Sequence, residues 1–403
     1  MSATRSDPRH AGTRRPPRKR MTLSWSDPKF RALIWQIIII GAVAWALWYL
    51  ISNTSYNLEH RHIATGFAFL DRTAGIPIGE HLISYDPAVN TYGRAIVIAI
   101  LNTLNVSIVT VLLVTIIGTV VGIAELSNNW LVAKLSATYV EVVRDIPVLL
   151  QLLFWYTLVQ TLPVIRQAWN PLPGIFISNR GIYFPKLVWQ NGHTAALMAF
   201  ILGIVLTVIV RRRAQRVQDA TGERPLTWPV VVGLLVVLPL VVWAAFGAPF
   251  TLDIPARRGF NFAGGGLFSP EYVALVTGLV VYTSTYAAEN VRTGILAVPR
   301  GQWEAAGALG LRRSTVLRTV VLPQSLRVII PPMTSTYLGA VKNSSLAVAI
   351  GYQDVVSIMN TILNQTGQAI EGIALVMAIY LCFSLGISLF MNWYNARIAL
   401  VER

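Results

Sequence analysis

The sequence predicts an all-α polytopic membrane protein with about eight transmembrane helices, and three observations support this fold class. Hydrophobic residues fill 54% of the 403 positions. Charged residues account for only 13%, whereas a soluble domain is usually about a quarter charged. Apolar runs long enough to cross a bilayer recur along the chain, and none shows the strict alternation of a membrane β-barrel.

The N-terminal region predicts a basic tail followed by a membrane anchor. Residues 1–31 are basic and lack apolar periodicity, which is typical of a disordered cytoplasmic tail. Residues 32–52 hold an apolar run of about 20 residues, enough to cross a hydrocarbon core of about 30 Å. The run is too long for a signal peptide and no cleavage site follows, so we predict a retained anchor with its N-terminus inside. Residues 53–93 are predicted to be a polar periplasmic loop.

Seven further apolar runs follow, and the basic residues between them indicate their direction. Arginines gather at 211–216 and across 292–327, which marks both segments as cytoplasmic by the positive-inside bias. Counting eight spans from an N-terminus inside places 211–228, 292–327 and the C-terminal segment 392–403 in the cytoplasm. The seven runs cover about 94–124, 136–162, 193–210, 229–247, 270–291, 328–350 and 371–391.

Two local signals predict how individual spans are built. Gly118 and Gly122 lie one helical turn apart in the second span, a spacing that favours close contact with another helix. Pro147 lies within the third run, where it is expected to break or kink the helix.

Composition also limits the chemistry that the chain can perform. The net charge is +15, and the basic residues flank apolar spans. Attraction to anionic lipid headgroups therefore explains this charge better than binding to nucleic acid does. Cys382 is the only cysteine, and its apolar setting predicts a packing role. His60 and His62 have no carboxylate or cysteine at a ligand spacing, so we predict no metal site. The chain also lacks a G-x-x-x-x-G-K nucleotide-binding motif.

Residues 300–325 lie between two spans and predict two short helices joined by a turn. Glu304 is expected early in the first helix, where its charge would meet the positive end of the helix dipole. Small residues around Ala306 would allow another surface to approach closely, and Gly310 is a candidate C-cap. Leu322-Pro323 is expected to end the second helix. On composition alone, an interfacial loop among lipid headgroups is the simpler interpretation.

The spacing in this segment resembles the EAA loop of ABC-importer permeases. The sequence reads Glu-Ala-Ala, three residues, Gly, nine residues, Val, one residue, Leu-Pro. Segments 143–156, 286–306 and 341–348 are similar to the polar amino-acid uptake branch of that family. The first span and the long insertion are similar to its general L-amino-acid permease subunits. The resemblance implies a coupling helix that docks into a partner ATPase through Glu304, Ala305, Ala306, Gly310, Leu322 and Pro323.

The same resemblance implies the domain organisation. It implies a type I ABC-importer permease-like core in two parts, 94–162 and 270–391, the second of which contains the coupling loop 292–327. The segment 163–269 is then an insertion with two transmembrane helices and periplasmic loops.

The implied function is that of a permease subunit in an ATP-driven importer for polar or general L-amino acids. It would work by alternating access in a bacterial inner membrane. The expected partners are two copies of a cytoplasmic ABC ATPase, a periplasmic amino-acid-binding protein and a second, homologous permease chain in a heterodimer. ATP and Mg²⁺ would be bound by the ATPase, and no cofactor by this chain.

An amino acid crosses the membrane as a zwitterion and needs polar partners in a medium of low dielectric constant. Lys342 is the strongest candidate because it lies within an apolar run and has polar neighbours. Glu289 either lines the pathway or pairs with Arg292. Asn102 and Asn105 are weaker candidates that suit interhelical hydrogen bonds. The full set of substrate-pathway candidates is Lys342, Asn343, Ser344, Ser345, Glu289, Arg144 and Asp145.

Three other functions are compatible with parts of the sequence. An ion-coupled secondary transporter would run without an ATPase, so uptake that stops on ATP depletion excludes it. A membrane enzyme would need a metal or acid–base constellation, and the sequence shows none. A non-transporting scaffold or signalling subunit would bind an ATPase and carry nothing.

Overall fold

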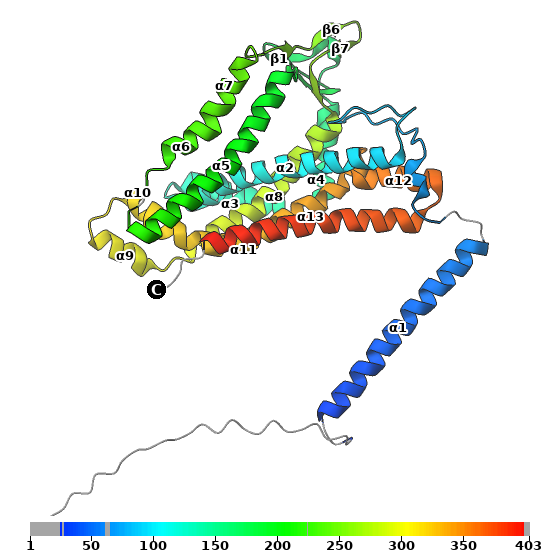
Figure 1. The fold of residues 1–403 in the computed structure, drawn as a ribbon, viewed down its shortest axis with the longest axis horizontal. Helices are drawn as coiled ribbons and strands as arrows, with labels where there is room; N and C mark the ends of the chain where they lie inside the picture. Colours follow the sequence, from blue (N-terminus) through cyan, green and yellow to red (C-terminus); the bar gives the residue numbers. More distant parts are fainter. Residues whose placement is uncertain (1–24, 26–27, 61–64, 224, 399–403) are drawn as a thin grey trace, which may run out of the picture. The chain divides into compact units, whose positions relative to one another are not determined.

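The computed structural model describes Trp25 and residues 28–60, 65–223 and 225–398 (Figure 1). The chain divides into two compact units, 1–66 and 67–403. The first unit contains α1, Pro28–His60, whose apolar part is not buried within the chain. This confirms a helix at the predicted first span. The helix continues to His60, so the predicted loop starts later than residue 53. Residues 1–24 of the predicted tail lie outside the described residues.

The second unit is a bundle of helices, with α9 and α10 at one end and α12 at the other (Figure 1). Its central helix is α8, which packs against α2, α4 and α11 and buries much of its length. The helices are α2 Tyr92–Glu125, α3 Trp130–Asp145, α4 Val148–Gln160, α5 Asn191–Thr221, α6 Trp228–Val232, α7 Leu238–Ala245, α8 Pro270–Leu296, α9 Arg300–Ala308, α10 Arg313–Val316, α11 Leu322–Asn343, α12 Val355–Thr366 and α13 Ala369–Ile398.

The helices agree approximately with the predicted eight spans. Among the described residues, five helices are long and apolar enough to cross a membrane, or seven if each of two bent pairs forms one span. The remaining predicted span corresponds to α8, which has 27 residues and is therefore about 40 Å long. Five consecutive polar residues at 282–286 lower its hydropathy.

The third predicted run is not one straight span, because α3 and α4 meet at an angle of 103°. Pro147 is the N-cap of α4, which confirms the predicted break. The Gln151 side chain donates to the carbonyl oxygens of Val143 and Ile146, at 2.9 and 3.0 Å. Gln151 therefore partners two carbonyls that the broken helix leaves without intrahelical bonds.

The prediction that Leu322-Pro323 ends a helix was wrong. A π turn over Leu317–Val321 joins α10 to α11, and Pro323 lies in the first turn of α11. A first-turn proline costs no helical hydrogen bond, and the wider π turn before it absorbs the irregularity. The helix then passes through a 3-10 segment, Ser344–Ile350, and bends by 51° before α12.

The loops on either side of α5, α6 and α7 fold into short antiparallel strands that the sequence analysis did not predict. One sheet has the order β1-β2-β3-β8, and two further pairs are β4-β5 and β6-β7. Pairing of β3 with β8 and of β4 with β5 joins the two predicted periplasmic loops. The strands are β1 Trp169–Leu172, β2 Ile175–Ser178, β3 Gly181–Phe184, β4 Lys186–Leu187, β5 Leu252–Asp253, β6 Ala256–Arg258, β7 Asn261–Ala263 and β8 Gly266–Phe268.

The contact between α2 and α8 confirms the close packing predicted from two glycines. A Cβ atom on Gly118 would overlap the Cβ of Ala287. A Cβ atom on Gly122 would lie 2.5 Å from the carbonyl oxygen of Ala288. The backbones can approach this closely only because neither glycine has a side chain.

The bundle separates the segments that were predicted on opposite sides of the membrane. A groove near α9 and α10 draws its lining from 123–132, 295–303 and 313–325, all predicted to be cytoplasmic or next to a cytoplasmic turn. A small cavity draws its lining from the predicted outer segments 79–80, 267–271 and 351–353. The arrangement therefore agrees with the alternation of spans, while the orientation of the termini and the domain boundaries stay predictions.

Candidate functional site

The short helix α9 ends in a Schellman-type cap, as the sequence predicted for Gly310. This glycine has φ of +71°, in the left-handed region. Its N–H donates to the Gly307 carbonyl at 2.9 Å, and the Leu311 N–H donates to the Ala306 carbonyl at 3.4 Å. These are the two bonds that close such a cap. Glu304 is the fifth of the nine residues of α9, so it lies in the middle of the helix and not early in it, as was expected.

The small-residue face of α9 differs from the predicted one. Ala306 is only 5% exposed, because it packs with Val298, Val316 and Val321 in a small core of this segment. It therefore does not present an outer docking surface. The outward face consists of exposed residues instead, with Leu309 exposed at 79%. We define the coupling face as Glu304, Ala305, Ala308 and Leu309.

The structure brings three predicted pathway candidates into one charged pocket of about 360 Å³. Arg292 forms an ion pair with Glu289 at 3.3 Å and reaches Glu125 at 3.5 Å. This confirms the expected pairing of Glu289 with Arg292. The Glu125 side chain is 6% exposed, and its Oε1 atom has no hydrogen-bond partner among the described residues. The ionisable residues that line this charged pocket are Glu125, Glu141, Arg144, Asp145 and Glu289.

A second pocket of about 360 Å³, the central groove, lies between α8 and α11. Asn343 is the predicted candidate that lines it. The hydroxyl groups of Tyr282 and Tyr286 lie 2.9 Å apart on α8, and Asn290 donates to Thr336 at 2.9 Å. The lining residues are Tyr282, Thr283, Tyr286, Ser335, Thr336, Gly339, Ala340 and Asn343.

Tyr286 lines both the charged pocket and the central groove. The Arg144 guanidinium lies over its ring, 4.9 Å from the centroid, where a cation–π interaction is favourable. The two pockets therefore adjoin at Tyr286, and we call their combined lining along α8 the polar track. Such a track can supply partners to a charged or zwitterionic solute between apolar helices.

Other predicted candidates lie outside this track. Lys342 is exposed on the surface of the chain and lines neither pocket. Ser344 is buried and its hydroxyl donates to the Val341 carbonyl, which is a local structural bond. Ser345 donates in the same way to the Lys342 carbonyl at 2.7 Å.

Asn102 in the second span holds two loops in place. Its side chain is 2% exposed and donates to the backbone oxygens of Glu80 and Gln353, at 2.9 and 3.0 Å. These bonds support a structural role for Asn102, although its partners lie in loops and not in another helix.

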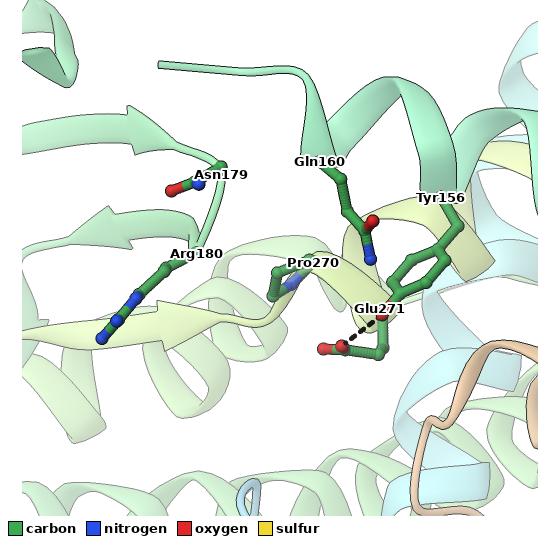
Figure 2. Close-up of a pocket in the computed structure, with 6 residues that line it drawn as sticks. All are labelled: Tyr156, Gln160, Asn179, Arg180, Pro270 and Glu271. Carbon is green, nitrogen blue, oxygen red and sulfur yellow. Dashed lines mark hydrogen bonds between the residues drawn. The ribbon is translucent and has the colours of Figure 1, made fainter. Parts of the chain in front are cut away.

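A polar pocket of about 380 Å³ lies at the predicted outer side, between α4, the β2–β3 turn and the start of α8. Figure 2 shows Asn179 and Arg180 on that turn, across the pocket from Tyr156 and Gln160. The Tyr156 hydroxyl donates to Glu271 at 3.1 Å. Glu80 lies in a smaller cavity beside Glu271, and burial raises the pKa of its carboxyl although the Ser269 N–H donates to it at 2.6 Å.

Sequence reasoning missed most of the uncharged residues along the track. The signal was present as the run "YTSTY" at 282–286, which interrupts an apolar span with five polar side chains. A similar run, "TST" at 334–336, lies in the facing helix. Neither run contains an acidic or basic residue, and neither lies beside one of the charged candidates of the sequence except at Glu289.

Comparisons with known proteins show the family to which the chain belongs. Residues 224–400 match the family described as the binding-protein-dependent transport system inner membrane component. YhdX of Escherichia coli (strain K12), named as an amino-acid ABC transporter permease protein, is 50% identical over 384 residues, 95% of this chain and 98% of YhdX. The general L-amino acid transport system permease protein AapQ of Rhizobium johnstonii is 46% identical over 378 residues, 94% of each chain. A crystal structure of an amino acid ABC transporter with histidines shares 19% identity and a TM-score of 0.45, over 76% of this chain and 95% of that one.

The helical bundle with its α9 segment and these relatives define the membrane-spanning permease subunit of an ABC importer. The chain belongs to the family of amino-acid ABC transporter permeases. It is a transport subunit and not itself an enzyme, since ATP hydrolysis in this family is carried out by a separate partner. The alternatives of a secondary transporter and of a non-transporting scaffold find no support.

Proposed function

We propose that the chain forms part of the translocation pathway of an ATP-driven importer for polar or general L-amino acids. The observation that carries this proposal is the polar track along α8, in which Tyr286 joins the central groove to the charged pocket. The name of AapQ, a general L-amino acid permease, supports the same substrate class.

The track supplies groups of both signs for a zwitterion. Arg144 can approach a substrate carboxylate, and Glu125 and Glu289, which pair with Arg292, can approach its ammonium group. The hydroxyl and amide groups of the central groove can replace water around uncharged polar side chains. Alternating access would open this track first to one side of the membrane and then to the other.

The coupling face is proposed to dock into the ATPase. Its exposed Leu309 and small Ala305 suit a groove in a partner surface, and the buried Ala306 anchors α9 to the α10–α11 segment. Closure of two ATPase copies would then move α9, and α11 would transmit that motion because the helix runs on from α10 through the π turn. ATP and Mg²⁺ are assigned to the ATPase.

The proposed assembly contains a periplasmic amino-acid-binding protein and a second, homologous permease chain in the bacterial inner membrane. We propose a heterodimer from the resemblance to the long general L-amino-acid permease subunits, and the match to 94% of AapQ supports that resemblance. Co-purification with a differently tagged copy of the same chain separates the possibilities, since only a homodimer retains both tags.

Uptake by the reconstituted transporter tests the function. Vesicles that contain the complex and internal ATP are given binding protein and a labelled L-amino acid outside. We expect uptake that requires ATP and continues after ionophores collapse all ion gradients. Uptake that follows an ion gradient without ATP would overturn the proposal. It would also be overturned if the only solutes taken up with ATP were not amino acids.

A further inference from the structure

A groove larger than the pockets described above lies beside α9 and has no role in the function proposed above. Its volume is about 950 Å³, and the ends of α2 and α8, the start of α3 and the α9–α11 segment form its walls. Its lining is mainly apolar and open to the outside. Ile123, Leu296 and Leu322 are 53%, 58% and 48% exposed.

Positive charge accompanies this apolar surface. Arg300, Arg313 and Arg318 line the groove, and none of its lining residues is acidic. All three arginines are exposed, and none forms an ion pair or side-chain hydrogen bond within the described part of the chain. Trp303, a residue type that favours the membrane interface, lines the same groove.

An apolar groove with a cationic rim fits an amphiphile with an anionic head. A soluble anion would leave the exposed leucines in water, and an uncharged lipid would leave three guanidinium groups without a counter-ion. The groove lies at the predicted cytoplasmic ends of α2 and α8, where lipid headgroups are expected. We propose that it binds an anionic phospholipid, with the phosphate between the three arginines and an acyl chain along the leucines.

The coupling face remains free when this groove is filled. Glu304, Ala305, Ala308 and Leu309 are not among the groove-lining residues. A lipid in the groove would touch α9 on one side and the ends of α2 and α8 on the other. It would therefore hold α9 against the spans while the ATPase docks on the coupling face, and anionic lipid would be needed for efficient coupling.

The test compares two sets of arginines in the assembled transporter. The groove variant is Arg300→Gln/Arg313→Gln/Arg318→Gln. The matched control is Arg211→Gln/Arg212→Gln/Arg213→Gln, which removes the same charge from exposed positions on α5 that do not line the groove. Lipid retained after purification is identified by mass spectrometry, and ATP hydrolysis is measured in phosphatidylcholine vesicles with and without phosphatidylglycerol.

We expect the wild type and the control to retain phosphatidylglycerol and to couple better when the vesicles contain it. The groove variant should lose this lipid, by about fivefold for each arginine removed, and its ATP hydrolysis should no longer respond to phosphatidylglycerol. Leu317→Gln, which changes only the apolar lining, should weaken retention without changing charge.

Three results would overturn the proposal. Equal lipid retention by the wild type and the groove variant would mean that the groove does not hold the lipid. Equal loss in both triple variants would indicate a diffuse surface charge rather than a site. Loss of the ATPase from the groove variant with lipid retention unchanged would assign the groove to the ATPase.

Discussion

Gly310 shows how one residue can determine the shape of the coupling segment. Gly310 and Gly301 both have open space where a Cβ would lie, but only Gly310 has a positive φ, +71°. Gly310→Ala should therefore cost about 1 kcal/mol or more through backbone strain alone, while Gly301→Ala should not. We expect Gly310→Ala to weaken retention of the ATPase in pull-down experiments. Equal ATPase retention by both variants would contradict a role for the cap.

Two neighbouring alanines should respond differently to the same substitution. Ala306 is buried in the α9 core, so Ala306→Trp should overpack it at a cost of roughly 1–3 kcal/mol and expose α9 to proteolysis. Ala305 is exposed on the coupling face, so Ala305→Trp should leave the segment folded yet reduce ATPase retention and substrate-stimulated hydrolysis. If Ala305→Trp keeps its ATPase and normal uptake, the coupling face is assigned incorrectly.

Tyr286 is the residue on which the polar track depends. Tyr286→Leu removes both the hydroxyl near Tyr282 and the ring beneath Arg144. We expect uptake to fall by about tenfold, equivalent to roughly 1.4 kcal/mol on the rate-limiting step, with assembly unchanged. Tyr394→Leu, at an exposed tyrosine on α13, is the matched control. Normal uptake by the Tyr286 variant would exclude this track as the pathway.

Helix packing between α2 and α8 gives a prediction for whole elements. Gly122→Ala would place a methyl group against the Ala288 carbonyl oxygen, whereas Gly386→Ala would meet nothing within 4 Å. The first change should lower thermal stability by roughly 1–3 kcal/mol, and the second should be neutral or add up to about 1 kcal/mol of helix propensity. Thermal unfolding of the purified complex measures both. Equal stability of the two variants would contradict the close α2–α8 contact.

Individual elements also show where sequence reasoning succeeds and where it stops. Apolar runs predicted the helices because the bilayer fixes both their length and their composition. Pro147 predicted the break between α3 and α4, since a proline in a helix interior removes a hydrogen bond and crowds the preceding turn. Pro323 misled because its effect depends on position, and the π turn before it is not encoded by any single residue.

The outer strands and the burial of Ala306 could not be predicted, for a different physical reason. Strands such as β4 and β5 have two residues each and exist only because distant loops meet. Burial of Ala306 likewise depends on the return of α10 toward α9, which no local pattern contains. Tertiary contacts of this kind cannot be predicted from the composition or the hydrophobic periodicity of a short segment.

At the scale of the whole molecule, the two ends of the helical bundle predict which surfaces lie on the same side of the membrane. Three reporter cysteines test this in a Cys382→Ser background, because the native cysteine is exposed. Gln218→Cys and Ala308→Cys lie in the predicted cytoplasmic segments, and Arg180→Cys lies on the outer β2–β3 turn.

In sealed spheroplasts, a membrane-impermeant thiol reagent should label only the cysteine at Arg180, because the bilayer separates it from the other two. After the membrane is opened, all three should react, which shows that each position is reachable. Arg180 lies beside the β3–β8 pairing at one end of the bundle, and the α9 segment with its groove lies at the other end. Labelling of the cysteines at Gln218 and Ala308 alone in sealed spheroplasts would reverse the orientation. Labelling of only one of those two would break the alternation of spans, and with it the placement of the coupling face beside a cytoplasmic ATPase.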